Sequence, residues 1–290
     1  MRRWIKGTLI TVVILLAIGL ISLFCALGMG ATSGSAHQTL SKYWSFLDSG
    51  KFHWGDDGGF HWGDDGNDTD ITNGNTYEFQ ASELRKMDLE VAKAKCRIYP
   101  AQKGEEDKIK IVIDRDSIHH FEVSDEDETL KLECRDSHGW RHTARIEIYL
   151  PDHIQWEKVT LSAGAGQLTS TQTLYTDEMK LEVGASDVKL DQVKAEKFKA
   201  EIGAGQVEIP YLDAQDIKLE ADAGKAQLGL PGDKKQYRTN ISCAAGEVKF
   251  GDETYAGLAN SHSNNPKDAV RDIKLECAAG SIIITFKEAV

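Results

Sequence analysis

Apolar and polar residues alternate along the C-terminal half of the chain in a phrase that recurs six times. In one copy Met179, Leu181 and Val183 are apolar, whereas Lys180 and Glu182 between them are charged. Alternation with a period of two is typical of a half-buried β-strand. The six copies occupy residues 159–166, 179–186, 198–205, 217–224, 239–246 and 273–280.

The copies follow one another at a nearly fixed interval. Their first residues are separated by 20, 19, 19, 22 and 34 positions. A period of about 20 residues indicates a repeat architecture in which each unit stacks on the next. Neighbouring strands stacked ~4.8 Å apart can bury a stripe that one unit alone would leave exposed.

Each phrase ends in a small-residue triplet, after which the alternation shifts by one residue. Counting on from Ala163 in steps of two reaches Gln167, yet the apolar residue found there is the next one, Leu168. A strand that continues to bury apolar residues through such a shift must turn a corner, and glycine permits it. The predicted structural glycines are Gly164, Gly166, Gly184, Gly203, Gly205, Gly224, Gly246 and Gly280.

These patterns predict an all-β protein whose residues 152–290 form a β-solenoid of about six coils of about 20 residues. The interval of 34 residues between the last two copies predicts an exposed loop, roughly 251–272. Outward lysines and glutamates should form parallel columns along the stack. A solvated charged face accounts for these columns, and a ligand-binding face is the alternative.

Residues 77–151 contain alternating strands without the glycine triplets. An open solenoid end would expose unpaired strand edges, so we expect this block to form a small sheet that caps the first coil. The strand ending in Leu150-Pro151, followed by strand-Gly-x-Gly units, resembles the bacterial putative-adhesin family of β-strand repeat proteins. These proteins are membrane-anchored or exported in Gram-positive bacteria. The resemblance implies a surface role and brings no catalytic residues.

The N-terminus has the features of a membrane anchor. Arg2, Arg3 and Lys6 precede residues 7–30, which contain no charged residue. Such a stretch is long enough to span a bilayer as a helix, and the basic cluster predicts residues 1–6 in the cytoplasm and the body outside. The lipid bilayer would then be one partner. Cleavage of a signal peptide near Ala36 is the alternative.

The net charge of the chain is −12, and without the three N-terminal cations it is −15. This acidic balance argues against nucleic acid and anionic lipid as partners.

Residues 31–76 have the composition of a flexible linker and contain a tandem repeat, 52–59 and 60–67, that begins Phe-His-Trp-Gly-Asp-Asp-Gly. Two other roles are open for it. Tyr43, Trp44 and Phe46 could lie at lipid headgroups, or a divalent cation could bind His53, His61 and the carboxylates of Asp56, Asp57, Asp64, Asp65, Asp68 and Asp70.

Four cysteines follow the predicted helix: Cys96, Cys134, Cys243 and Cys277. Cys243 and Cys277 occupy the same inward position of the last two copies, so they should lie on adjacent coils. They are either buried apolar side chains or a disulfide.

No nucleotide-binding loop, nucleophile elbow or metalloprotease helix is present. Cys134, His138 and His142, with His119 and His120 earlier in the chain, could in principle bind zinc. A hairpin whose tip carries histidines is the preferred explanation. We predict neither catalytic nor cofactor-binding residues. The expected function is that of a non-enzymatic, single-pass cell-surface protein that binds an envelope protein or glycan. A sensor ectodomain of an envelope-stress system and a carbohydrate-active enzyme are the alternatives.

Overall fold

The computed structural model describes residues 52–54, 60–62 and 74–287, except 106, 115–116, 135–142, 153 and 257–259. The chain divides into two units, residues 1–52 and 53–290. The predicted membrane helix and most of the predicted linker lie outside the described residues. The described residues include no candidate membrane-spanning helix. The helices described there are three short 3-10 turns, η1 (Ala81–Glu83), η2 (Ile118–His120) and η3 (Lys234–Gln236).

The tandem repeat contributes two short strands. β1 (Phe52–Trp54) and β2 (Phe60–Trp62) carry the same three residues and pair as a two-stranded sheet.

The repeat region folds as a parallel stack of coils, as its period predicts. β10 (Gln155–Ser170) pairs in parallel with β11 (Leu174–Leu190), and Val159 lies opposite Met179. The next coils are β12 (Gln192–Ile202) with β13 (Gln206–Ile209), and β14 (Tyr211–Ala221) with β15 (Lys225–Pro231). Met179 lies opposite Phe198, and Phe198 opposite Ile217, so equivalent residues of the copies form columns.

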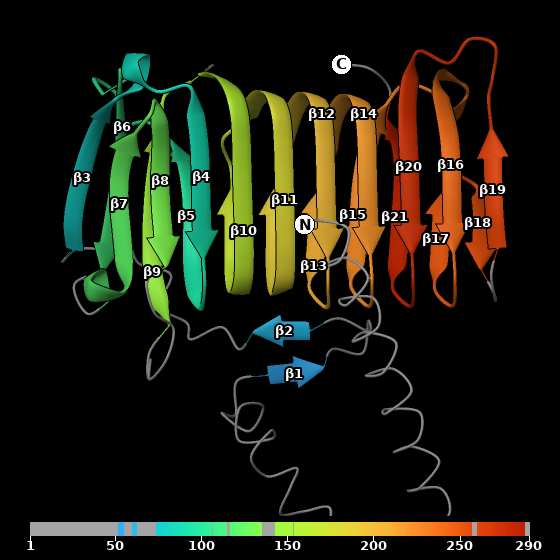
Figure 1. Ribbon diagram of the computed structural model, residues 1–290, viewed down its shortest axis with the longest axis horizontal. Helices are drawn as coiled ribbons and strands as arrows, with labels where there is room; N and C mark the ends of the chain where they lie inside the picture. The colour runs from blue at the N-terminus through green and yellow to red at the C-terminus, as the bar shows by residue number, and fades with distance from the viewer. Residues whose placement is uncertain are drawn as a thin grey trace, which may run out of the picture. The chain divides into compact units, whose positions relative to one another are not determined.

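The order of the last coils departs from the order of the sequence. The sixth copy, β20 (Arg271–Cys277) with β21 (Ser281–Lys287), lies between the fourth copy and the fifth, which is β16 (Tyr237–Cys243) with β17 (Glu247–Phe250). Ile273 is therefore the register partner of both Ile217 and Thr239. Figure 1 shows β20 between β14 and β16. The fifth copy is therefore separated from the fourth by the width of one coil, and the sixth copy occupies the position between them.

The N-terminal block is part of the stack, which corrects the expectation of a separate capping sheet. β4 (Lys86–Val91) and β5 (Ala94–Pro100) pair in parallel with β10, and β8 (Thr129–Cys134) and β9 (Ala144–Leu150) pair in parallel with β4 and β5. The described residues thus form eight coils, two more than the glycine triplets predict. The sequence has no glycine triplet here. At the corner between β4 and β5, Lys93 adopts a positive φ of 50° instead.

Both ends of the stack are covered by antiparallel strands. At one end β7 (Phe121–Glu126) pairs with β8, β6 (Lys108–Asp114) with β9, and β3 (Gly74–Gln80) with β6. At the other end β19 (Asn260–Asn264) pairs with β16, and β18 (Glu253–Ala256) with β17. The segment 251–272, expected to be an exposed loop, thus supplies two strands that satisfy the edge of the last coil.

Each coil presents two broad outer faces. We call face A the one formed by β8, β4, β12, β14, β20, β16 and the first halves of β10 and β11. Face B is formed by the strands after the corner: β9, β5, β13, β15, β21, β17 and the second halves of β10 and β11. Between the faces lies a continuous apolar core in which Trp156, Phe198 and Tyr237 are fully buried.

The corner glycines are constrained mainly by the neighbouring coil. Gly166 has a positive φ of 132°, which favours glycine. Gly205 has no such φ, but a Cβ there would lie 2.3 Å from the carbonyl oxygen of Ser186. Comparable contacts below 3.0 Å would arise at Gly184, Gly224, Gly246 and Gly280. Gly203 is tight at 3.2 Å, whereas a Cβ on Gly164 would be 3.7 Å from its nearest neighbour.

Candidate functional site: a polar hollow on face B

The outward charges of face A are largely paired with one another. Lys180 and Lys199 each bind the glutamate two residues further along their strand, Glu182 and Glu201. Lys274 lies 2.6 Å from Glu276 in the same arrangement. Since lysine and glutamate columns neutralise each other, face A has the character of a solvated charged surface.

Glu220 lies in a different environment from these three glutamates. Lys218, two residues before it, pairs with Asp216 at 3.5 Å instead. The pKa of Glu220 is raised, first by partial burial and then by the neighbouring carboxylate of Glu276. In contrast, the hydrogen bond from Lys180 lowers the pKa of Glu182.

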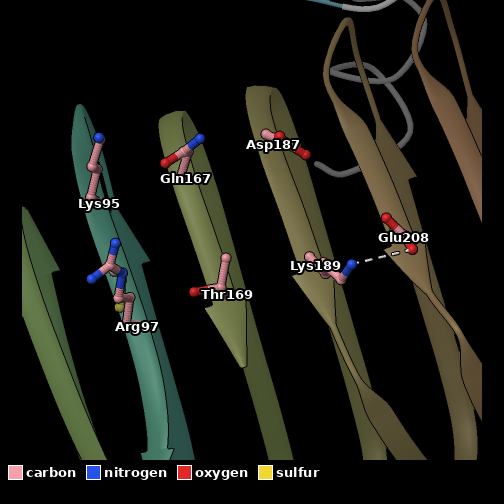
Figure 2. A pocket seen from close by; sticks show the side chains of 8 residues that line it. Lys95, Arg97, Gln167, Thr169, Asp187, Lys189 and Glu208 are labelled. Atoms are coloured by element: carbon pink, nitrogen blue, oxygen red, sulfur yellow. Dashed lines mark ion pairs between the residues drawn. The ribbon is translucent and has the colours of Figure 1, made fainter. Parts of the chain in front are cut away.

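Face B carries a hollow of about 170 Å³ that crosses four coils. Figure 2 shows polar side chains standing over it from β5, β10, β11 and β13. They are Lys95, Arg97, Gln167, Thr169, Asp187, Lys189 and Glu208. None of them repeats from coil to coil, unlike the lysines and glutamates of face A.

The register places these side chains in two rows across the strands. One row runs from Lys95 through Gln167 to Asp187, and Arg97, Thr169, Lys189 and Glu208 form the other. Cations therefore stand at one end, uncharged groups in the middle and mixed charges at the far end. The ion pair between Lys189 and Glu208, 3.5 Å long, partly neutralises that far end.

The two uncharged side chains are available for a ligand. In the part of the chain that the structure describes, the side chains of Gln167 and Thr169 are half-buried and bond to no other protein group. An amide and a hydroxyl in this position can both donate and accept hydrogen bonds.

Cys96 lines the hollow from below. Its thiol is buried, and burial raises its pKa to about 12. The thiol therefore stays protonated at neutral pH, which makes it a poor nucleophile.

A pair of aromatic rings adjoins the cationic end. Tyr99 and Tyr149 lie on the neighbouring strands β5 and β9 and stack with ring centroids 5.6 Å apart. The ammonium group of Lys110 lies 5.7 Å from the centroid of Tyr149, and the Tyr149 hydroxyl donates to Glu147 at 3.1 Å.

Of the residues singled out from the sequence, Cys243 and Cys277 are brought together. They are register partners on β16 and β20, both buried and both unpaired as thiols. Burial is the main reason that the pKa of Cys277 is raised. Their place in the core makes them packing residues of the last coils.

The other metal-site hypotheses are only partly covered. Cys134 is half-buried at the end of β8, whereas His138 and His142 lie outside the described residues. The side chains of His53 and His61 are likewise outside them. Within the described ranges, no three His, Cys, Asp or Glu residues are positioned to hold a metal ion.

The stack, its corner and its parallel register agree with a sequence-family match. Residues 84–229, from just before β4 into β15, match the Toastrack DUF4097 family. The chain belongs to the Toastrack DUF4097 family. No curated protein matches the chain.

The solved structures to which the chain is similar include three bacterial proteins. A putative cell adhesion protein from Clostridium sporogenes is 14% identical, with 74% of this chain and 100% of that chain covered and a TM-score of 0.44. A putative adhesin from Bacteroides fragilis is 14% identical over 74% of this chain and 98% of that chain, with a TM-score of 0.29. A putative lipid binding protein from Parabacteroides distasonis is 11% identical, with coverage of 76% and 98% and a TM-score of 0.29.

Sequence reasoning did not find the hollow. The available signal was the second strand of each Toastrack coil, where the outward residues Gln167, Asp187 and Gln206 vary while those of face A repeat. A binding surface requires specific side chains, so it would interrupt an otherwise regular pattern of outward residues.

Proposed function

We propose that this Toastrack protein is a non-enzymatic cell-surface binding protein that presents its solenoid to a partner through an outer face. The observation that supports this most is the shape of the outer faces. The hollows on face B and face A have volumes of about 170 and 110 Å³. Sites that enclose a small molecule usually measure roughly 300–1,000 Å³. Shallow polar surfaces suit a partner that lies across several coils.

The proposal includes attachment to the cell membrane by one N-terminal helix with the solenoid outside. The basic residues Arg2, Arg3 and Lys6 before the uncharged segment 7–30 support this topology. The net charge of −15 beyond that segment supports a partner that is not a dense polyanion.

Protease treatment of intact cells tests the topology. We expect added protease to remove the solenoid and leave a small membrane-bound fragment, whereas a cytoplasmic control protein stays intact. Full protection of the solenoid in intact cells would contradict the proposed location.

A cell-attachment assay tests the binding role. Cells that display the full chain should adhere to immobilised envelope material more strongly than cells that display a chain lacking residues 77–290. Equal adhesion would contradict a binding function.

A further inference from the structure

We propose that the hollow on face B binds a linear glycan whose carboxylates are isolated between uncharged sugars. This inference rests on the proposed surface-binding function and names its ligand class. Three observations support it. They are the order of charges across the hollow, the polar side chains of Gln167 and Thr169 at its centre, and the stacked aromatic pair beside it.

The cationic end suits one carboxylate. Lys95 and Arg97 project from the same side of β5. On the next coil Arg145 is the register partner of Lys95, and Glu147 is the register partner of Arg97. Charge-assisted hydrogen bonds from such groups to a carboxylate are stronger than neutral ones. The three cations outnumber the single carboxylate of Glu147 here, in a chain whose net charge is −12.

The middle of the hollow suits an uncharged sugar. Gln167 and Thr169, on the coil next to Lys95 and Arg97, offer donors and acceptors that bond to no other group of the described protein. Sugar hydroxyls need partners of both kinds. Successive coils lie ~4.8 Å apart, close to the length of one sugar in an extended chain.

The far end disfavours a second anion two sugars beyond the first, because Asp187 lies two coils from Lys95. Asp187 follows Gln167 in one row, and Glu208 ends the other beyond Lys189. A polymer with a carboxylate on every sugar would meet these like charges. Duplex nucleic acid, with one charge per ~1.7 Å, would meet them even more closely.

The flank of the hollow favours a glycan over an apolar protein surface. The stacked rings of Tyr99 and Tyr149 offer a face on which the C–H side of a sugar can pack. Val270, at 70% exposure, is the single exposed large hydrophobic side chain in the described part of the chain, and it directly precedes β20 of face A. The interface therefore offers polar contacts with one small aromatic platform.

Binding of defined glycans to the purified full-length protein in detergent tests the inference. The probes are hyaluronate trisaccharides, in which one carboxylate sugar lies between two uncharged ones, polygalacturonate, with a carboxylate on every sugar, and uncharged dextran. We expect the wild-type protein to bind hyaluronate tightest. Lys95→Gln should weaken that binding about tenfold, the cost of one charge-assisted hydrogen bond.

Two further variants separate a site from a general charge effect. Gln167→Ala changes no charge and should also weaken hyaluronate binding, whereas Lys199→Gln on face A should leave it unchanged. Melting temperatures of all variants establish that they are folded. No hyaluronate binding, polygalacturonate binding as tight as hyaluronate, or equal loss in Lys95→Gln and Lys199→Gln would overturn the inference. If the cell-attachment assay is still positive, the proposed surface function survives that failure.

Discussion

At the residue scale, the corners of most coils require a residue without a side chain, because the neighbouring coil leaves no room for a Cβ atom. The third position of each triplet falls in one column, in which every copy but one has glycine and Ser186 is the exception. Crowding by the preceding coil explains this column better than backbone conformation does, since only Gly166 among these glycines has a positive φ.

A pair of alanine variants tests that explanation. Gly205→Ala places a Cβ 2.3 Å from the Ser186 carbonyl oxygen and 2.7 Å from Cγ1 of Val183. Overpacking of this kind costs about 1–3 kcal/mol, so the free energy of unfolding should fall by that amount. Gly164→Ala, with 3.7 Å of room, should change it by less than about 0.5 kcal/mol. Chemical denaturation measures both, and equal losses would show that the crowding is not the cause.

Two glutamates of one column give opposite pH dependence. Glu182 has a lowered pKa because Lys180 donates to it, so its carboxylate stabilises the fold above its ordinary pKa and the benefit is lost as the pH falls through the folded value. Glu220 has a raised pKa, so its stabilising contribution is complete below its ordinary pKa and is lost as the pH rises through the folded value.

At pH 7, Glu182→Gln should therefore lower the free energy of unfolding and Glu220→Gln should raise it. Both side chains are substantially exposed, so each change should be about 0.5 kcal/mol or less. Both differences in the free energy of unfolding should vanish in strong acid, where the protonated glutamic acids at positions 182 and 220 are uncharged, like the glutamines that replace them. Thermal melts at neutral and acidic pH check this, and changes of the same sign would refute the assigned causes.

At the scale of elements, the ends of the stack explain how the solenoid avoids growing by edge pairing. A parallel coil leaves its outer backbone groups unpaired, and these would recruit another chain. β18 and β19 satisfy those groups on β17 and β16 in antiparallel pairing.

Replacing residues 253–264 with a short Gly-Ser linker should uncover both edges. We expect the variant to self-associate with rising concentration, because unpaired strand edges are templates for further strands. Sedimentation velocity over a range of concentrations measures this. A Gly-Ser replacement of residues 101–104, which form no strand, is the control. A variant without the cap that sediments like the control would show that the edge strands are dispensable.

At the scale of the whole molecule, the repeat pattern predicts the architecture but not its full extent. Alternation and the 20-residue period identify the parallel coils, because inward apolar columns such as Val159, Met179 and Phe198 determine the register. The coils of the N-terminal block escape prediction because their corners lack glycine triplets. The hollow escapes it because its side chains come from four separate strands, which only the register aligns.

The order of the last coils could not be predicted from the pattern alone. Any copy of the phrase can stack on any other copy, since all place their inward side chains at equivalent positions. Adjacency of Cys243 and Cys277 holds for the sequential order as well as for the observed one, so a disulfide between them would not separate the two. The distinguishing neighbour is Ala221, which lies opposite Cys277.

Disulfide mapping with a cysteine at position 221 tests this arrangement most directly. In the observed order, Ala221→Cys combined with Cys243→Ser places the new thiol beside Cys277, at a strand spacing of ~4.8 Å that a disulfide can bridge. Ala221→Cys combined with Cys277→Ser leaves the new thiol two coils from Cys243, about 9–10 Å away and out of reach. We expect oxidation and mass mapping to show the cross-link in the first variant alone. A cross-link in the second variant alone would contradict the stack as described.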